Sequence, residues 1–337
     1  MTVRLALVMG DPAGIGPELT ARLLAEPDLL RQAAILVIAD RRMLEEGARR
    51  GGVALDLPVV RQAAEARPEP GRPVLLDMAN ADPATIRPAV ASAEGGRATL
   101  ENFTLGLDLA RDGAVEAIVF TPFNKQALRL GGSTHEDELR YAAGYLGYQG
   151  AHAEFNVVDE IWNARVTSHV PISAVAGLIT EEAILRNLEL TVAALQEAGF
   201  ERPRIAVAAL NPHAGDGGNF GREEIEVIAP AVEKAKARGW AVDGPWPSDT
   251  VYLRARAGKA DAVLTMYHDQ GQIAIKLIGF DRGVTVLGGL PVPICTPAHG
   301  TAYDIVGQGT ANLEPTRRAF AIACRMAESR RAGTAAA

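Results

Sequence analysis

Short apolar runs alternate with longer amphipathic stretches along most of the chain. The apolar runs are rich in Val, Ile, Leu and Ala, which is typical of buried strands, and they cover residues 5–9, 35–39, 115–120, 205–210, 262–266 and 284–287. The longer stretches repeat apolar residues at helical spacing and predict helices over residues 17–24, 98–111, 181–198 and 223–238. Because strands and helices alternate, the pattern predicts an α/β fold with mostly parallel, doubly wound sheets. Six prolines within residues 53–88 exclude a long helix there, so we expect that stretch to wrap the surface.

Composition agrees with this pattern and excludes several classes of protein. With 337 residues, 48% of them hydrophobic, the chain can bury a large core, and two domains are expected. The formal charge is −7 and the arginines are scattered, so no nucleic acid or membrane partner is expected. Two cysteines, Cys295 and Cys324, cannot form a disulfide framework. The first apolar run is too short for a signal peptide or a membrane span, so a cytoplasmic location is expected.

Three of the six histidines follow predicted strands closely: His169, His213 and His268. The carboxyl ends of parallel strands meet at one edge of a sheet, so residues far apart in sequence can come together there. Three imidazoles at that edge would bind a divalent metal ion, such as zinc, cobalt or manganese. Taken singly, each histidine is more commonly a hydrogen-bonded residue at a strand end, so the interpretation depends on the three together.

The residues around two of these histidines support a ligand site. His213 opens a glycine-rich run, residues 214–221, that allows the backbone to approach a ligand. His268 is followed by Asp269 and Gln270, polar groups that can orient its imidazole. A cation held by histidines with an open coordination position also activates water, so these residues alone leave a metal-dependent hydrolase open.

Five motifs spread over nearly the full length resemble the 4-hydroxythreonine-4-phosphate dehydrogenase family, the PdxA family. They are residues 9–18 (MGDPAGIGPE), 121–125 (TPFNK), 210–215 (LNPHAG), 248–250 (SDT) and 266–271 (MYHDQG). By its chemistry alone, the first motif is a Gly/Pro turn at a strand exit without the spaced glycines of a Rossmann site. The resemblance extends to divergent members such as terephthalate dihydrodiol dehydrogenase.

This resemblance implies an isocitrate/isopropylmalate dehydrogenase-like fold with two domains. Residues 1–125 and 280–337 would form a discontinuous cofactor-side domain, and residues 126–279 a central domain for metal binding and dimerisation. The family resemblance also implies a homodimer whose active site lies in a cleft between the domains and uses both chains. Since that fold is similar to that of phosphate acyltransferases, an acyltransferase is a further alternative.

The resemblance also assigns roles to individual residues. The family's metal ligands match His169, His213 and His268. A substrate-contacting lysine matches Lys276, and an aspartate near the substrate matches Asp249. From the residues alone, Lys276 is equally explained as a lysine whose charged end reaches solvent.

A segment near the C-terminal end, residues 299–312 (HGTAYDIVGQGTAN), is similar to the adenosine-binding loop of the decarboxylating dehydrogenases. By this resemblance His299, Asp304 and Asn312 would bind NAD or NADP. Its glycines allow close backbone approach, and Asp304 can accept hydrogen bonds from ribose hydroxyls. Without the resemblance, the segment is an ordinary surface loop.

These assignments lead to a hypothesis about the reaction. The metal ion would stabilise the alkoxide of a small hydroxy acid while hydride leaves to the nicotinamide. If the product is a β-keto acid, the same ion would hold the enolate formed as carbon dioxide departs. Lys276 would then supply a proton or pair with a carboxylate.

Departures from the family pattern bear on the substrate. Where the family has Gly-His-Thr-Glu, this chain has residues 133–138 (STHEDE), which place carboxylates such as Glu136 beside His135. A family asparagine and arginine that bind substrate fall on Thr285 and Ile294, which removes an anion clamp. We therefore expect a cis-dihydrodiol carboxylate, such as the terephthalate dihydrodiol, slightly ahead of 4-hydroxythreonine 4-phosphate or a four-carbon sugar-acid phosphate.

Overall fold

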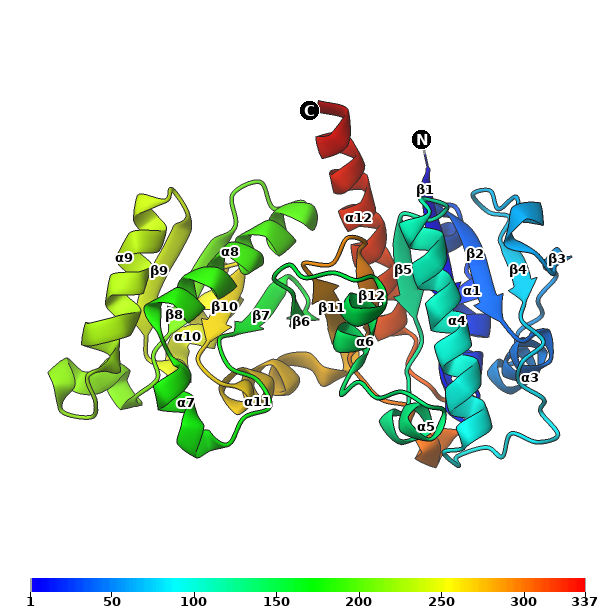
Figure 1. Ribbon diagram of the computed structural model, residues 1–337, viewed down its shortest axis with the longest axis horizontal. Helices are drawn as coiled ribbons and strands as arrows, with labels where there is room; N and C mark the ends of the chain where they lie inside the picture. Colours follow the sequence, from blue (N-terminus) through cyan, green and yellow to red (C-terminus); the bar gives the residue numbers. More distant parts are fainter. Residues whose placement is uncertain (1, 337) are drawn as a thin grey trace. The chain divides into compact units, whose positions relative to one another are not determined.

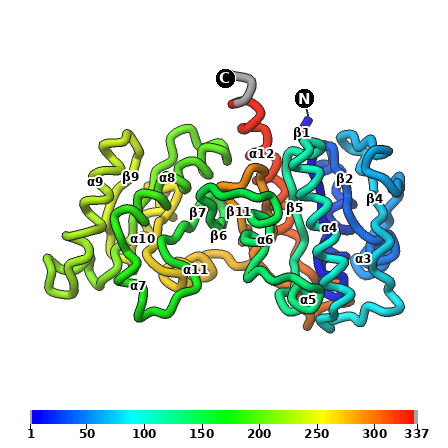
Figure 2. The backbone as a smooth tube through the Cα atoms, viewed as in Figure 1, coloured from blue at the N-terminus to red at the C-terminus, as the bar shows by residue number. Residues whose placement is uncertain are grey.

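The computed structural model describes residues 2–336 and divides into two compact units (Figure 1). Unit 1 comprises Met1–Gly150 and Val284–Ala337, and unit 2 comprises Ala151–Gly283. The first and last elements of the chain, β1 and α12, both belong to unit 1, as the tube in Figure 2 shows. Residues 126–150, which we expected in the central domain, fall in unit 1 because Leu128 and Ala142 pack into its core.

Unit 1 contains a mostly parallel sheet in the strand order β3-β4-β2-β1-β5-β12-β11. Each pair of neighbours is parallel except β11 and β12. The strands are β1 (Val3–Val8), β2 (Ala33–Ala39), β3 (Val59–Val60), β4 (Val74–Asp77), β5 (Ala117–Phe120), β11 (Val284–Gly288) and β12 (Ile294–Pro297). β12 returns from the far end of the sequence to lie directly beside β5, so the last part of the chain completes this sheet.

Helices cover the sheet of unit 1 because its strands are apolar on both sides. Alternate residues such as Val8 and Ile118 pack in one buried cluster with Phe103 and Leu107 of α4. The helix α4 begins where the Ser92 hydroxyl accepts a hydrogen bond from the Gly95 N–H. The helices of the unit are α1 (Gly16–Leu24), α2 (Pro27–Leu30), α3 (Arg41–Gly51), α4 (Ala93–Arg111), α5 (Lys125–Leu130), α6 (Glu138–Tyr145) and α12 (Glu314–Ala336).

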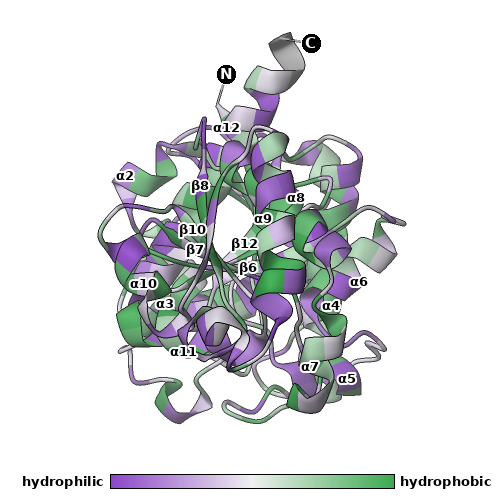
Figure 3. Ribbon diagram, turned by 90° about the vertical axis from the view of Figure 1, so that its left-hand side faces the viewer, coloured by the Kyte–Doolittle hydropathy of each residue, from purple (hydrophilic) through white to green (hydrophobic). Residues whose placement is uncertain are grey.

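Unit 2 has a smaller sheet in the order β6-β7-β10-β8-β9, in which only β6 and β7 run antiparallel. Its strands are β6 (Ala153–Val158), β7 (Ile161–Arg165), β8 (Arg204–Ala208), β9 (Ala241–Trp246) and β10 (Ala262–Thr265). Its helices are α7 (Ile172–Leu178), α8 (Glu181–Glu197), α9 (Ala229–Ala237), α10 (Ser248–Arg256) and α11 (His268–Gly279). Figure 3 shows hydrophilic and hydrophobic residues alternating along helices such as α8 and α9, as expected for helices with one buried face.

The expected α/β class with mostly parallel sheets is confirmed, and every strand and helix predicted from the sequence is present. The helix predicted over residues 223–238 consists of a π-helical turn, η3 (Glu224–Ile228), followed by α9. Among residues 2–336, no helix is long and apolar enough to cross a membrane.

Candidate active site

The three histidines of unit 2 follow neighbouring strands, as predicted. His169 comes after β7, His268 after β10 and His213 after β8. These strands are adjacent and parallel in the order β7-β10-β8. Their carboxyl ends therefore share one edge of the sheet, which is where ligands bind in open α/β sheets.

Two of the three imidazoles lie together. The ring centroids of His169 and His268 are 5.5 Å apart. Nδ1 of His268 lies 2.7 Å from a carboxylate oxygen of Asp269, an arrangement that orients an imidazole so that Nε2 can bind a metal ion. This pair therefore fits a divalent cation in its donor chemistry.

The third imidazole is placed differently. The His213 ring lies 6.2 Å from the ring of Phe220, measured between centroids. Over the described part of the chain, no group of three or more His, Cys, Asp or Glu side chains is arranged to hold a metal ion. The structure thus pairs His169 with His268, and the metal site with all three ligands stays a prediction.

The backbone at two of these histidines is strained. His169 has a φ of 26°, and His213 begins a run of six residues with positive φ inside η2 (Pro212–Gly218). Besides His213, the non-glycine residues of this run are Ala214 and Asp216, for which a left-handed backbone costs about 1–2 kcal/mol each. Such strain persists where the surrounding structure enforces it, and it concentrates at functional sites.

One buried carboxylate supports the strained turn. Glu224, 3% exposed, accepts hydrogen bonds from the backbone N–H groups of Leu210 and Asn211 at 2.9 and 2.7 Å. A Cβ on Gly215 would lie 2.8 Å from the Glu224 carboxylate, so only glycine fits there. Glu224 was not among the predicted site residues, although its position just after the glycine-rich run is a usable signal.

Gln270 joins the strand ends to one another. Its amide nitrogen donates to the Ala209 carbonyl at 2.7 Å and to the Ser248 hydroxyl at 2.8 Å. Its amide oxygen accepts from the Met266 N–H at 2.7 Å. The sequence suggested that Gln270 orients an imidazole; in the structure Asp269 makes that contact, and Gln270 links the ends of β8 and β10 to the start of α10.

A buried arginine that the sequence analysis also missed lies beside His169. The Arg165 guanidinium donates to the hydroxyl of Ser168 and to the amide oxygen of Asn156, both at 2.7 Å. The same amide oxygen accepts a hydrogen bond from Gln272 of α11. Arg165 therefore connects the residue preceding His169 with the helix that carries His268. An arginine inside a strand was the available signal, because such a charge is rarely buried without partners.

The two predicted catalytic residues are exposed on helices of unit 2. Lys276 lies on α11 about two turns beyond His268, with its Nζ 5.9 Å from the centre of the Phe280 ring. Asp249 lies in the first turn of α10, next to the Ser248 that Gln270 binds. Both belong to helices that start at the strand ends just described.

The predicted cofactor residues lie in unit 1. His299 Nδ1 is 3.0 Å from the Gly300 carbonyl, whereas its Nε2 is buried without a partner. Burial lowers the pKa of His299, which favours a neutral ring with Nε2 as an acceptor. Such an acceptor fits a hydroxyl or amino group of a dinucleotide. Asp304 is exposed, and Asn312 accepts the Glu314 N–H at 3.1 Å at the start of α12.

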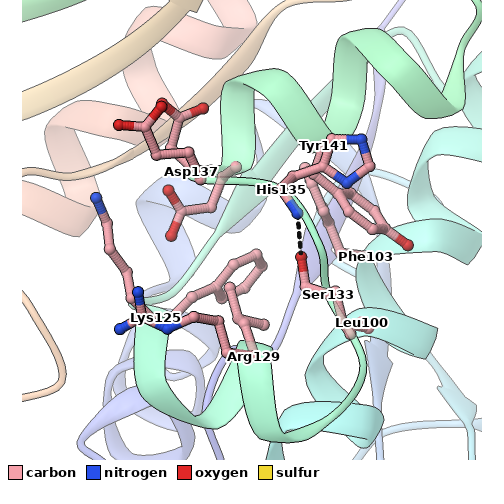
Figure 4. Close-up of a pocket in the computed structure, with 12 residues that line it drawn as sticks. Leu100, Phe103, Lys125, Arg129, Ser133, His135, Asp137 and Tyr141 are labelled. Atoms are coloured by element: carbon pink, nitrogen blue, oxygen red, sulfur yellow. Dashed lines mark hydrogen bonds between the residues drawn. The ribbon is translucent and has the colours of Figure 1, made fainter. Parts of the chain in front are cut away.

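The predicted substrate residues of unit 1 are only partly brought together. His135 and Glu136 line a small pocket between α4, α5 and α6, which encloses about 10 Å³ (Figure 4), room for about one water molecule. Thr285 lies on β11. Ile294 is fully buried in the core, so in this structure its side chain is a core residue and we do not retain it as a substrate contact.

The charges around this pocket differ from those expected. Arg140 binds the carboxylates of Glu136 and Asp137 at 2.6 and 2.7 Å. Lys125 and Arg129 extend from α5 along one side of the pocket (Figure 4). Neither has a carboxylate partner among the described residues. Arg140 therefore offsets one of the three negative charges that Glu136, Asp137 and Glu138 bring to the pocket lining, and Lys125 and Arg129 add two positive charges to the same lining.

Comparison with known proteins finds that the chain is similar to dehydrogenases over almost its whole length. Residues 31–323 match the family model described as "Pyridoxal phosphate biosynthetic protein PdxA". A Rhizobium meliloti protein with the name "Putative 4-hydroxythreonine-4-phosphate dehydrogenase 2" is 55% identical over 99% of this chain and 96% of its own length. The crystal structure of 4-hydroxythreonine-4-phosphate dehydrogenase from Klebsiella pneumoniae is similar with a TM-score of 0.82 and 34% identity, over 97% of this chain and 98% of that one.

Two further relatives carry other substrate names. The D-threonate 4-phosphate dehydrogenase of Pectobacterium atrosepticum is 35% identical over 97% of this chain and its own full length. A terephthalate 1,2-cis-dihydrodiol dehydrogenase from Burkholderia xenovorans is more distant, with 27% identity and a TM-score of 0.64 over 94% of this chain and 95% of that one. Similarity is thus greater to enzymes named for phosphorylated substrates, which goes against our expectation of a dihydrodiol. The chain belongs to the PdxA family of dehydrogenases.

Proposed function

We propose that this protein is an NAD- or NADP-dependent, divalent-metal-dependent dehydrogenase that oxidises the hydroxyl of a phosphorylated four-carbon hydroxy acid. 4-Hydroxythreonine 4-phosphate and D-threonate 4-phosphate represent this class. The proposal replaces the dihydrodiol carboxylate that the sequence alone favoured.

The observation that carries the choice of substrate is the charge arrangement at the His135 pocket. The dihydrodiol was favoured because carboxylates beside His135 would repel a phosphate and because Thr285 and Ile294 stand where the family has an anion clamp. Arg140 binds those carboxylates, while Lys125 and Arg129 line the same pocket. A phosphate over the mouth of this pocket would accept charge-assisted hydrogen bonds from the two cations and from the Ser133 hydroxyl.

The chemistry is assigned to unit 2. His169, His213 and His268 would hold the cation, which when bound supplies a positive charge to the oxygen of the reacting alcohol. Asp269 holds the His268 imidazole through Nδ1, leaving Nε2 directed to a ligand. Lys276 would protonate the carbon from which carbon dioxide leaves if the oxidised acid decarboxylates, and Asp249 would accept the proton of the hydroxyl.

The dinucleotide is assigned to residues 299–312 of unit 1. The unpartnered Nε2 of His299 supports this assignment because a buried acceptor without a donor is unfavourable until a ligand fills it. Asp304 would bind ribose hydroxyls and Asn312 the base.

We also propose that the enzyme is a homodimer. Ile273, Leu277 and Phe280 are 60, 83 and 49% exposed. They follow the i, i+4, i+7 spacing of one helix face on and just beyond α11. Such an apolar stripe beside Lys276 fits burial against a second copy of the chain. Measuring the molar mass of the protein in solution by light scattering tests this, and a monomer at micromolar concentration would contradict it.

Steady-state kinetics test the substrate assignment. The two phosphate esters, their unphosphorylated counterparts and the terephthalate dihydrodiol should be compared with NAD and NADP in the presence of zinc, cobalt or manganese. We expect the highest kcat/KM with a phosphate ester. Clear preference for the dihydrodiol would overturn the proposed class, and absence of nicotinamide reduction with every substrate would count against a dehydrogenase.

Two variants test whether Lys125 and Arg129 bind the phosphate, and a third controls for effects of removing any exposed lysine. Lys125→Ala and Arg129→Ala should each raise KM for the phosphate ester by roughly 10-fold, since a hydrogen bond to a charged group contributes about 1.5–3 kcal/mol. Lys259→Ala, which removes an exposed lysine just after α10, serves as the control and should leave KM unchanged. Equal KM values in all three variants would remove Lys125 and Arg129 from the substrate site.

A further inference from the structure

The first family motif, residues 9–18, received no role from its own chemistry, and in the structure it holds a buried carboxylate. Asp11 is 1% exposed. One of its oxygens accepts the Ala13 N–H at 3.0 Å, and the other accepts the Tyr303 hydroxyl at 2.5 Å. Burial raises the pKa of Asp11, and no cation pairs with it in the described part of the chain. Tyr303 is therefore its one side-chain donor.

Tyr303 belongs to the 299–312 segment that we assign to the dinucleotide. The two ends of this segment are fixed to the rest of unit 1. Near the start, the Thr301 carbonyl accepts the Ile15 N–H at 3.1 Å. Near the end, the Ala311 carbonyl accepts a hydrogen bond from Arg22 at 2.5 Å, and the Ala311 N–H donates to Glu18 at 3.2 Å. Motif residues thus hold both ends.

Between these ends lie residues 302–310. Among the described residues, the Tyr303–Asp11 bond is the one side-chain hydrogen bond that joins this stretch to the rest of unit 1. The residue before Tyr303, Ala302, has a left-handed backbone with a φ of 42°. A non-glycine residue in this conformation must be held by its surroundings. The bond at Tyr303 lies immediately next to that strained position, where it can hold the turn.

We propose that Asp11 and Tyr303 are positioning residues for the dinucleotide, because their bond keeps the 299–312 segment in its binding conformation. This inference rests on the proposed function, since it takes the 299–312 segment as the cofactor site. Without the bond, the segment samples other conformations, and binding must first select the competent one. The apparent affinity is then the intrinsic affinity multiplied by the fraction of molecules in the binding conformation.

Tyr303→Phe tests the proposal because it keeps the ring and removes only the hydroxyl. Tyr145→Phe is the matched control: Tyr145 also donates to an aspartate of unit 1, Asp108 at 2.9 Å, but on α6 and outside the segment. Two quantities are measured: amide hydrogen exchange across residues 299–312 in the ligand-free protein, by mass spectrometry, and the Kd for NADH and NADPH, by fluorescence.

For Tyr303→Phe we expect exchange within residues 301–310 to quicken about 10-fold and dinucleotide Kd to rise about 10-fold, with the loss appearing in KM for the cofactor more than in kcat. The control should match the wild-type protein in each measurement. Unchanged exchange and affinity, or faster exchange with unchanged affinity, would overturn the positioning role. Asp11→Asn, judged by the same measurements, decides the matter if Tyr303→Phe does not fold.

Failure of the proposed function gives a different result. If the wild-type protein binds neither NADH nor NADPH, the assignment of the segment to a dinucleotide is wrong, and the positioning of a cofactor is excluded with it. Exchange rates still report whether the bond orders the segment. If the wild-type protein binds a dinucleotide and the variant binds it equally well, only the role of Asp11 and Tyr303 is lost.

Discussion

The guanidinium of Arg140 lies 2.6 Å from the carboxylate of Glu136, and this contact changes the charge that a ligand would meet at the His135 pocket. The same guanidinium binds Asp137. Arg140 thereby offsets part of the negative charge that the sequence places beside His135.

Arg140→Ala should therefore weaken binding of a phosphate ester without unfolding the protein. The freed carboxylates would repel the phosphate, and we expect KM to rise several-fold at low salt and less at high salt, because exposed charges are screened. Arg111→Ala, which removes another exposed arginine that pairs with two aspartates of unit 1, is the control. Equal KM values for both variants at low salt would show that Arg140 does not shape this pocket.

Asp269→Asn should lower the affinity for a divalent cation by about 10- to 100-fold, the usual effect of removing a carboxylate that orients a metal-binding histidine. The measurement is titration of metal-stripped protein with zinc or cobalt in a calorimeter. Asp281→Asn changes an exposed aspartate just beyond α11 and should bind as the wild-type protein does. If wild-type protein binds and Asp269→Asn binds equally well, the contact with His268 has no role in the site.

Gln270→Ala should reduce the free energy of unfolding by about 1–3 kcal/mol, because it strips hydrogen-bond partners from the Ala209 carbonyl and the Met266 N–H. Urea denaturation followed by circular dichroism measures this change. Gln308→Ala removes only an exposed bond to the Asp304 carbonyl and should change little. A Gln270→Ala protein as stable as this control would mean that the strand ends are held by other contacts.

Dinucleotide affinity should be kept at pH 6.5 and fall only at lower pH, where the buried His299 ring of the folded protein takes up a proton. Burial holds the pKa of His299 below its usual 6.5, so the folded protein binds this proton less readily than the unfolded chain. The contribution of His299 to the free energy of unfolding is therefore complete above pH 6.5. It declines at lower pH, where acid protonates the unfolded chain first. Protonation of the folded protein would also remove the Nε2 acceptor.

Measuring Kd for NADH between pH 5 and 8 checks the effect, with His299→Gln as the comparison. The variant should bind more weakly at pH 8 and lose less affinity on acidification. An identical pH profile in the two proteins would assign the acid sensitivity to another group.

Much of the fold could be predicted because its strands are apolar on both faces and its helices carry clear stripes. Two of the strands that were missed show why prediction failed for the others. β7 contains Asn163 and Arg165, polar residues that interrupt an apolar pattern and that make hydrogen bonds with other elements. β4 lies within the proline-rich stretch that we expected only to wrap the surface, yet residues Val74–Asp77 are buried beside β2.

The location of the three histidines at strand ends could be predicted because proximity to a strand end is visible in the sequence. How the three imidazoles lie relative to one another could not be predicted from the sequence. The pairing of His169 with His268 depends on strand order, and the contact of His213 with Phe220 depends on a strained turn. Counting along the family pattern matched Ile294 to a substrate-binding position but could not say which surface of β12 this residue faces. Successive residues of a strand point to opposite faces, and here the isoleucine points into the core.

Unit 2 is a single continuous stretch, whereas unit 1 is assembled from both ends of the sequence. During synthesis, residues 151–283 can leave the ribosome and fold before β12, the neighbour of β5 in the sheet of unit 1, has left the ribosome. Chains that end just before Val284 and have been released from the ribosome should therefore contain a protease-resistant fragment from unit 2. The sheet of unit 1 would close only once the final segment leaves the exit tunnel.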